Sequence, residues 1–349
     1  MSDSHVPTVA LYGAGMISRA HGAAATFIGS PVVAVASRTA ARAAERAAEF
    51  GGDAVTYDDL VSARVPADVI VVSTPPQRHA DDVLALLPTG AAVLIEKPLC
   101  RTLHEADLIV EAAHGHGGRL LYGENLAYAP VVQQLLRMVP QLGQLTHLEV
   151  RSLQGLPTWG DFTSDEWGGG ALFDLGVHPL TVAMLCANAS GAGAPTAVSA
   201  TLIGGEGHGS DEHAEVHLHY ATGLVATVIS SWKAGPSPQW DAQLASAGGV
   251  LRADLMPEPT VEHNGVAVAL PPVNTPVPAV EQFGYLGQLQ ALIADTGRGD
   301  TPLMSAEVGR RVLDVVCAAY RSAGRQGALE ALPFTGRRDR TPLQLWRGE

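Results

Sequence analysis

Apolar positions in the first third of the chain fall into short continuous runs separated by segments with helical spacing. The runs are residues 9–12, 32–36, 69–72, 91–95 and 119–122. Continuous apolar runs of this length are typical of parallel strands buried on both faces. Segments with helical patterns follow the first three runs: one continues to about residue 28, the next covers 39–50, and the third starts near 79. The pattern predicts an α/β fold built on a doubly wound parallel sheet.

After about residue 125 the pattern changes. Longer β-rich stretches are separated by turn residues such as Gly204-Gly205 and Pro236-Ser237-Pro238, and they cover residues 146–153, 196–203, 214–220 and 223–232. Two amphipathic helices follow. One shows Phe283, Leu286, Leu289 and Ile293 on a single face, and the other starts at Ser305 as N-cap and ends at Gly324. We therefore predict a first domain over residues 1–125 and a second α+β domain over 126–349, with a large, mostly antiparallel sheet and helices on one face.

Composition narrows the class of protein. Apolar residues make up 46% of the chain and charged residues 16%, which is typical of a globular protein. The net charge of −13 argues against nucleic acid or an anionic membrane as the main partner. The three cysteines are far apart in the sequence, which fits a reducing compartment rather than a disulfide framework or a zinc site. No signal peptide is recognised at Met1-Ser2-Asp3-Ser4-His5, and no apolar stretch is long enough to span a membrane, so we expect a cytoplasmic protein.

A glycine-rich turn after the first apolar run indicates dinucleotide binding. Gly13-Ala14-Gly15-Met16-Ile17-Ser18 follows a predicted strand and opens a helix, which is the context the fingerprint requires. Gly13 permits the tight turn, and Gly15 lets the backbone approach a pyrophosphate at the helix N-terminus. Ser18 takes the place of the third glycine and is small enough for close packing. A structural turn without a ligand is the alternative interpretation.

The end of the second run favours NADP over NAD. An acidic residue usually binds the adenosine ribose diol at this position, but this chain has Ser37-Arg38. A hydroxyl and a guanidinium can bind a 2′-phosphate, which a carboxylate would repel. The alternative is that Arg38 stacks on adenine or points into solvent.

Two further segments carry candidate chemistry. The run 93–95 leads directly into Glu96-Lys97-Pro98, so Lys97 is expected at the carboxyl end of a strand, facing a bound nicotinamide. Gly168-Gly169-Gly170 precedes Asp174 and His178, which are four residues apart and are expected to share one helix face. A carboxylate beside an imidazole fixes the ring and raises its basicity, as a general acid/base requires. The alternative is an ordinary exposed polar pair.

These residues together resemble the glucose-fructose oxidoreductase, inositol dehydrogenase and rhizopine catabolism family (Gfo/Idh/MocA). The resemblance rests on the glycine turn, Thr74-Pro75-Pro76 with His79, Glu96-Lys97-Pro98, the triple glycine with His178, and the segment 211–232. It implies a Rossmann NAD(P)-binding domain over residues 1–125, a substrate-binding and oligomerisation domain over 126–349, and a homodimer or homotetramer. It also implies catalytic roles for Lys97, Asp174 and His178. The implied cofactor-binding residues are Gly13, Gly15, Met16, Ile17, Ser37, Arg38, Thr74, Pro75, His79, Glu96 and Lys97.

The sequence departs from the family pattern in the region that lines the substrate site. Thr181 stands where an acidic residue often follows the histidine, and the arginine common before the triple glycine is missing around Trp159-Gly160-Asp161. The exact substrate is therefore not transferred from the family.

His213, His217 and His219 alternate along a predicted strand, but we interpret them as hydrated or core-edge residues rather than metal ligands. Trp159, Trp167 and Trp232 are candidates for stacking on a sugar, with burial in the core as the alternative.

The leading hypothesis is an NAD(P)-dependent oxidoreductase acting on a secondary alcohol or ketone of a sugar, cyclitol or related polyol, with NADP preferred and no metal. One alternative is a nucleotide-binding sensor without turnover. Another is a lyase or glycosidase that retains its cofactor and uses transient oxidation.

Overall fold

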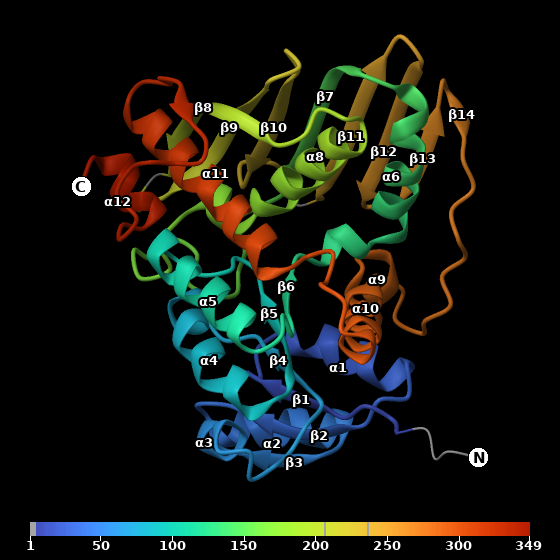
Figure 1. Cartoon of the computed structure of the whole chain (residues 1–349), viewed down its shortest axis with the longest axis vertical. Coiled ribbons are helices and arrows are strands. Elements are labelled where there is room, and N and C mark those ends of the chain that lie inside the picture. The colour runs from blue at the N-terminus through green and yellow to red at the C-terminus, as the bar shows by residue number, and fades with distance from the viewer. Residues whose placement is uncertain (1–4, 206, 236) are drawn as a thin grey trace. The chain divides into compact units, whose positions relative to one another are not determined.

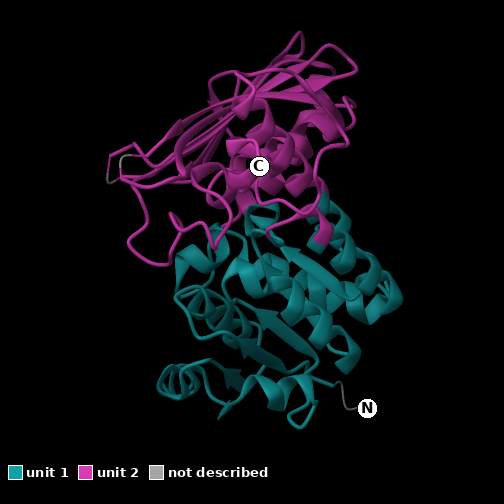
Figure 2. Ribbon diagram, turned by 90° about the vertical axis from the view of Figure 1, so that its left-hand side faces the viewer, with its two compact units in different colours: residues 1–100, 105–129, 273–310 teal, residues 101–104, 130–272, 311–349 magenta. Residues whose placement is uncertain are grey.

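The computed structural model describes residues 5–205, 207–235 and 237–349 (Figure 1). Residues 1–4 and Pro236, on which the leader and turn predictions partly rested, lie outside the described residues. The chain divides into two compact units, coloured separately in Figure 2. Unit 1 comprises Met1–Cys100, Glu105–Ala129 and Val273–Arg310, and unit 2 comprises Arg101–His104, Pro130–Pro272 and Arg311–Glu349.

Unit 1 contains the predicted parallel sheet. Its six strands lie in the order β3-β2-β1-β4-β5-β6, which is the order of a dinucleotide-binding Rossmann sheet. Every residue of β1, β4, β5 and β6 is buried, as their continuous apolar runs predicted. The strands are β1 (Val9–Tyr12), β2 (Val32–Ala36), β3 (Asp53–Val55), β4 (Val69–Val72), β5 (Ala92–Glu96) and β6 (Leu120–Gly123).

Helices connect these strands. Helix α2 ends where Gly51 adopts φ +91°, a conformation that favours glycine. The helices are α1 (Ser18–Phe27), α2 (Ala40–Phe50), α3 (Tyr57–Val61), α4 (His79–Leu86), α5 (Leu103–Gly115), α9 (Pro278–Gln282) and α10 (Tyr285–Arg298). Three short 3-10 helices lie at η1 (Pro76–Arg78), η2 (Leu87–Thr89) and η3 (Asn125–Tyr128).

The segment Val273–Arg310 differs from its predicted assignment, because it belongs to unit 1 rather than to the second domain. Its helix α10 carries the predicted apolar stripe, and Leu286, Leu289 and Leu292 are buried. Helix α10 packs against α1, η3, β5 and β6 and against the neighbouring α9. Sequence periodicity identified the helix but not the surface on which it packs.

Unit 2 is built on a nine-stranded sheet with the order β14-β13-β12-β11-β7-β10-β9-β8-β15. Among the described strand pairs of this sheet, only β7 and β10 run parallel, so the mostly antiparallel prediction is confirmed. The strands are β7 (Leu145–Leu153), β8 (Pro195–Gly204), β9 (Asp211–Tyr220), β10 (Val225–Ser231), β11 (Gln239–Ser246), β12 (Gly249–Met256), β13 (Thr260–His263), β14 (Val266–Ala267) and β15 (Glu330–Ala331).

One face of this sheet is buried under helices. Along β9, for example, Ala214, Val216, Leu218 and Tyr220 are buried, and the residues between them are partly exposed. The helices of unit 2 are α6 (Pro130–Leu142), α7 (Ala171–Asp174), α8 (Val177–Ala189), α12 (Pro342–Arg347) and, from Arg311 on, α11 (Ala306–Gly324). Figure 1 shows α6, α8 and α11 against the same side of the strands. In the part of the chain that the structure describes, no helix combines the length and apolar character needed to cross a membrane.

Candidate active site

The predicted cofactor residues of unit 1 collect at one edge of its parallel sheet. Gly13 directly follows β1, Ser37 follows β2, Thr74 lies two residues after β4, and Lys97 follows β5. Because β1 pairs in parallel with β2 and β4, and β4 with β5, these strand ends face the same way. Ligands of open α/β sheets bind outside the carboxyl ends of the strands. Unit 1 thus presents these residues along a single edge of its sheet, the edge at which such sheets bind ligands.

The glycine turn has the geometry that a dinucleotide requires. Gly13 has φ +123°, and a Cβ there would lie 2.8 Å from the Ser73 carbonyl carbon, so no other residue fits without rearrangement. A Cβ at Gly15 would meet nothing within 4 Å, which leaves that side of the turn open. The N-cap Ile17 makes no side-chain cap at the start of α1. The residues therefore fit a dinucleotide, and Gly13, Gly15, Met16 and Ile17 are the residues that would hold its pyrophosphate.

Ser18 fills the third glycine position with a satisfied hydroxyl. Its Oγ donates to the Gly15 carbonyl at 2.6 Å and accepts from Arg46 Nε at 3.0 Å, and the side chain is fully buried. The serine thus keeps the close packing that the motif needs and links the turn to α2.

After β2, Ser37 is partly buried and Arg38 is exposed. The Ser37 hydroxyl accepts a hydrogen bond from the Thr39 N–H at 3.3 Å. Among the described residues, the Arg38 guanidinium makes no ion pair with a carboxylate.

A group of residues that the sequence did not reveal surrounds this edge. The rings of Tyr12 and Tyr57 lie 4.3 Å apart, and the Arg78 guanidinium lies 5.2 Å from the Tyr57 centroid. Arg78 also pairs with the buried Asp82 at 2.7 Å, and Asp82 accepts from Thr74 Oγ1 at 2.6 Å. The end of β4 is therefore tied to the ends of β1 and β3. Tyr57 follows β3, a strand that the sequence pattern did not predict, so its position was not foreseen.

His79 occupies a different place from the predicted cofactor contact. It is 1% exposed, and its two ring nitrogens lie 2.8 Å from the Pro98 carbonyl and 2.7 Å from the Thr74 carbonyl. Burial lowers the pKa of His79, although both carbonyl contacts oppose this shift. The ring therefore joins the segments that follow β4 and β5 from inside the core.

Glu96 is likewise buried rather than on the ligand edge. Its Oε1 lies 2.7 Å from His21 Nε2 on α1, and its Oε2 accepts from the Lys97 N–H at 3.2 Å. Lys97 itself is partly exposed. The strand end thus separates a buried carboxylate from an ammonium that can reach the edge.

In unit 2, the triple glycine is required by close approaches. Gly168 has φ +96°, which favours glycine. A Cβ at Gly169 would lie 2.1 Å from Phe173 Cβ, and one at Gly170 would lie 2.3 Å from the Asp211 carbonyl oxygen. The segment therefore packs against β9 and its own helix more tightly than any side chain would allow.

The prediction that Asp174 and His178 share one helix face needs correction. Asp174 ends α7, and His178 is the second residue of α8, with a turn at Leu175-Gly176 between them. A Cβ at Gly176 would lie 2.6 Å from the Leu172 carbonyl oxygen, so the glycine permits this tight break. The two side chains are only 7% and 6% exposed, which excludes the alternative of an exposed polar pair.

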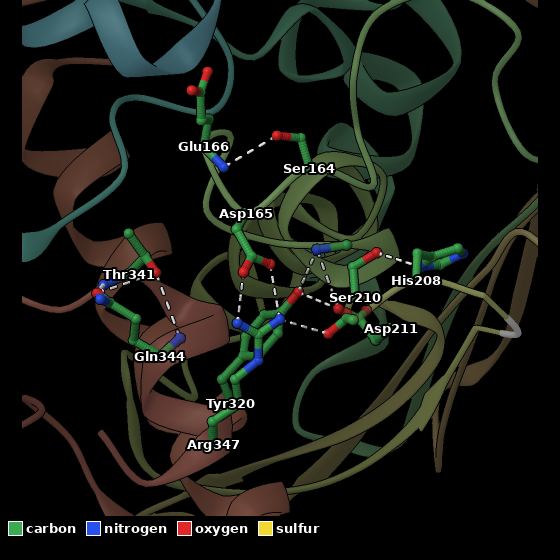
Figure 3. Close-up of polar contacts among 12 residues, drawn as sticks. Ser164, Asp165, Glu166, His208, Ser210, Asp211, Tyr320, Thr341, Gln344 and Arg347 are labelled. Carbon is green, nitrogen blue, oxygen red and sulfur yellow. Dashed lines mark hydrogen bonds and ion pairs between the residues drawn. The ribbon is translucent and has the colours of Figure 1, made fainter.

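A buried carboxylate holds the start of α7 (Figure 3). Asp211 accepts from the N–H groups of Gly170 at 3.1 Å and Leu172 at 2.8 Å, and from the hydroxyl of Tyr320. The Tyr320 oxygen also accepts from the Gly170 N–H at 2.9 Å. Burial raises the pKa of Asp211 to about 6, although these donors oppose the shift. Gly170, at the N-cap of α7, has no side chain that could cap the helix. Asp211, on strand β9, caps it instead.

Figure 3 also shows α12 bound to the loop that leads into the triple glycine. Arg347 of α12 makes two hydrogen bonds of 2.8 Å to the Asp165 carboxylate and one of 3.1 Å to the Gly209 carbonyl. The Leu343 N–H donates to the Gly168 carbonyl at 3.0 Å. Helix α12 therefore anchors the loop that leads into the triple glycine.

One tryptophan, Trp240, lies against the His178 ring. The ring of Trp240 lies 5.2 Å from that of His178 with an interplanar angle of 33°. Trp232 belongs to the core with Ala171 and Leu175, whereas Trp159 is 47% exposed. Sequence analysis had not singled out Trp240, because β11 was not predicted.

The structure places the three histidines that alternate along β9. His213, His217 and His219 lie partly exposed on the outer face of the sheet, with His217 3.1 Å from Glu215 and His219 3.2 Å from Ser199. Within the described residues, no group of three or more His, Cys, Asp or Glu side chains is arranged to hold a metal ion.

Thr181, which replaces the family's acidic residue, is buried. Its hydroxyl donates to the Val177 carbonyl at 2.8 Å within α8.

Comparison with known proteins places the chain in a family. A family model described as "Oxidoreductase family, NAD-binding Rossmann fold" matches residues 8–124, and one described as "GFO/IDH/MocA C-terminal domain" matches residues 132–251. An Amycolatopsis mediterranei protein named "Putative UDP-kanosamine synthase oxidoreductase subunit" is 30% identical over 297 residues, which is 76% of this chain and 81% of that protein. The chain belongs to the Gfo/Idh/MocA family of oxidoreductases.

More distant similarities agree with this assignment. The D-xylose 1-dehydrogenase (NADP(+)) 2 of Haloferax volcanii is 26% identical over 85% of this chain and 91% of its own length. The D-glucoside 3-dehydrogenase of Escherichia coli is 35% identical over 40% of this chain and 42% of its own length. The crystal structure of GenD2 from gentamicin A biosynthesis in complex with NAD shares the fold, with a TM-score of 0.82, 23% identity, and coverage of 94% of this chain and 98% of that one.

Proposed function

We propose that this protein transfers a hydride between a nicotinamide cofactor and a secondary alcohol or ketone of a sugar, cyclitol or related polyol. The observation that carries the proposal is the shared edge in unit 1, where the ends of β1, β2, β4 and β5 bring Gly13, Ser37, Thr74 and Lys97 into one row. The names of relatives that act on glucosides and xylose support a carbohydrate substrate.

The chain's own residues handle the reacting oxygen and its proton. Lys97 holds that oxygen and stabilises negative charge on it. His178 acts as general acid/base, and Asp174 orients its ring. When bound, the nicotinamide supplies or accepts the hydride. The burial of Asp174 and His178, with Trp240 against the imidazole, supports a site from which water is largely excluded.

NADP is the proposed preferred cofactor. Ser37 and the exposed Arg38 guanidinium, which makes no ion pair among the described residues, support binding of a 2′-phosphate. The relatives include one whose name specifies NADP(+), while a structural neighbour was solved with NAD. The preference for NADP is therefore argued from Ser37 and Arg38, and not from the relatives.

Assembly into a homodimer or homotetramer is proposed through the outer face of the unit 2 sheet. This face carries the exposed apolar side chains Ile203, Val225 and Val250 beside partly exposed polar ones such as Thr227. The same face carries the partly exposed His213, His217 and His219, and a second copy of the chain would cover its apolar positions.

A panel of polyols and keto-sugars tests the reaction. Each compound is incubated with purified protein and either NAD(H) or NADP(H), and nicotinamide absorbance is followed. We expect turnover that requires added cofactor and is lost in Lys97→Ala. Product formed without added cofactor, by protein that retains its own, would indicate a lyase or glycosidase. Tight nucleotide binding without turnover of any compound would indicate a sensor.

A further inference from the structure

Arg78 lies at the same strand edge of unit 1 as the predicted cofactor residues, but the dinucleotide fingerprint does not include it. It belongs to η1, and its side chain is 47% exposed. Two contacts hold this side chain: a salt bridge to Asp82 and a contact with the ring of Tyr57. The hydride transfer proposed above uses neither of them. The two contacts show how the guanidinium is presented, and hence what it can bind.

The salt bridge to Asp82 fixes the plane of the guanidinium. The Asp82 carboxylate accepts from Nη2 of Arg78 at 2.7 Å and from its Nε at 3.3 Å. Contact at two points orients a guanidinium as well as attracting it. Asp82 is only 2% exposed, and it also accepts from Thr74 Oγ1 at 2.6 Å and from the Tyr12 hydroxyl at 3.3 Å. The carboxylate is therefore anchored inside unit 1, and Arg78 is anchored with it.

The ring of Tyr57 covers one side of the guanidinium. The central carbon of the Arg78 guanidinium lies 5.2 Å from the ring centroid of Tyr57. The Tyr12 ring in turn packs against Tyr57, with 4.3 Å between the ring centroids and an interplanar angle of 31°. Burial raises the pKa of Tyr57 above its usual value, so the phenol is neutral at pH 7. The exposed part of the guanidinium therefore lies on the side away from Tyr57 and Asp82.

The register of the sheet places Arg78 at the adenosine end of the edge. Strand β2 pairs in parallel with β3, with Ala36 opposite Val55, and Arg38 and Tyr57 each follow these paired residues by two positions. The charges of Arg38 and Arg78 both act on the Tyr57 hydroxyl. In Rossmann domains, the residues after β2 meet the adenosine ribose of the cofactor. Arg78 therefore belongs to the part of the edge that receives adenosine.

The charge balance at Arg78 favours a neutral base over a phosphate. An anionic ligand would compete with Asp82 for the guanidinium, and a buried carboxylate that loses its cation is strongly destabilising. A flat, uncharged ring needs no such exchange, because a guanidinium stacks on aromatic faces while its edge stays hydrogen-bonded. Arg38 differs, since it is exposed and makes no ion pair with a carboxylate among the described residues. Arg38 thus suits a phosphate, and Arg78 suits the base.

We propose that Arg78 is a cofactor-binding residue whose guanidinium stacks on the adenine ring, and that Asp82 and Tyr57 are positioning residues that hold it there. The inference rests on the proposed function in one respect, namely that the cofactor is an adenine dinucleotide. NAD and NADP carry the same base, so this contact contributes equally to the affinity for both. Selectivity between the two cofactors stays with Ser37 and Arg38.

Calorimetric titration with NAD, NADP and ADP-ribose tests the inference without any need for turnover. ADP-ribose carries the adenine end of the cofactor and lacks the nicotinamide. Arg78→Ala should weaken the binding of all three ligands by the same factor, about tenfold, because each loses one cation–ring contact. Arg78→Lys keeps a positive charge for Asp82 but loses the planar group, so it should weaken binding nearly as much.

Arg64→Ala is a matched control. Arg64 is an exposed arginine of the same unit that also pairs with a carboxylate, that of Asp59, at 3.1 Å. This variant should bind all three ligands like the parent. Arg38→Ala gives the contrast, because it should weaken NADP alone. Circular dichroism shows which variants are folded, and if Arg78→Ala is not, Arg78→Lys, which keeps a cation beside the buried Asp82, decides the question.

The inference is overturned if a folded Arg78→Ala protein binds all three ligands like the parent, or if its loss is confined to NADP, which would indicate a phosphate contact. Parent-like affinity in Arg78→Lys would also overturn it, because the charge and not the planar group would then be responsible. Uniform loss of affinity in a protein that turns over no polyol or keto-sugar would support the inference and refute the proposed reaction. Turnover with unchanged affinity would do the reverse, and a parent protein that binds none of the three ligands would refute both.

Discussion

Lys97 follows the buried strand β5 without being buried itself, so its replacement is expected to affect chemistry more than folding. Lys97→Ala should lower kcat about 100-fold or more, because the proposed donor to the reacting oxygen is lost. His178→Ala should have an effect of similar size through loss of general acid/base catalysis. Asp174→Asn should be non-additive with His178→Ala, since it acts through the same ring.

Turnover must be measured beside melting temperature and nucleotide affinity. His178 is buried against Trp240, so its truncation is expected to lower the melting temperature as well. Nucleotide affinity should stay near the parent value. Near-parent turnover in a folded Lys97→Ala protein would refute the assignment.

Arg38 carries the prediction on cofactor choice. Arg38→Ala should weaken NADP binding about ten- to a hundredfold, because one charge-assisted contact contributes about 1.5–3 kcal/mol. NAD affinity should change little. Arg42→Ala, one turn further on in α2 and also exposed, is the matched control. Titration of both cofactors checks the prediction, and an unchanged NADP affinity in Arg38→Ala would contradict it.

At the scale of elements, α7 depends on groups outside itself. It has four residues, too few for an isolated helix to be stable, and Asp211 and Tyr320 cap its first turn. Tyr320→Phe should lower the free energy of unfolding by about 1–2 kcal/mol, because the hydroxyl loses its hydrogen bonds with the Gly170 N–H and the Asp211 carboxylate. Tyr220→Phe is the control, because that buried hydroxyl has no partner among the described residues. Equal effects of the two substitutions in denaturant unfolding would contradict the capping role.

The same cap should make stability depend on pH. The pKa of Asp211 is raised to about 6 in the folded protein, from a usual value of 3.8. The folded state therefore binds the proton more tightly, so this contribution to stability is full below about pH 4 and is lost as pH rises to about 6. Asp211→Asn has no carboxyl group to titrate at this position, so its stability lacks this pH-dependent contribution. The melting temperature of the variant relative to the parent should rise between pH 4 and 6 and then level off.

Elements buried on both faces were the most predictable from sequence. The observed β1, β2 and β4 coincide with their apolar runs, and β5 differs by one residue. Strands β11 to β13 were missed because they mix polar and apolar residues, and because the sequence just before β11 is rich in proline. The three residues of β3 include no buried position. Its sequence therefore lacks the apolar run by which the buried strands were predicted.

The candidate site could be predicted where one local motif builds it. The glycine turn and Lys97 belong to that class, because a strand end fixes their position. Trp240 and Tyr320 do not, since each reaches the site from an element distant in sequence. Spacing alone also suggested one continuous helix for Asp174 and His178, because it could not show the turn that Gly176 permits.

For the whole molecule, the open face of the unit 2 sheet carries the prediction on assembly. Light scattering should give a mass two or four times that of the single chain at micromolar concentration. Val225→Lys should shift the population toward monomer, because Val225 is 45% exposed on that face. Phe27→Lys, an exposed apolar position in unit 1, should leave the mass unchanged. A parent protein that is monomeric throughout would refute the assembly.

The assignment of Val273–Arg310 to unit 1 has a consequence for biosynthesis. The Rossmann strands leave the ribosome before the sheet strands β7 to β14, but α10, whose Tyr285 lies edge-on to the His21 ring, is made only after those sheet strands. Until then, the apolar surface that α10 covers on α1 and β5 stays exposed to water or to other chains, a condition that favours aggregation. The nucleotide-binding unit is therefore begun first during translation and completed only when most of its partner unit already exists.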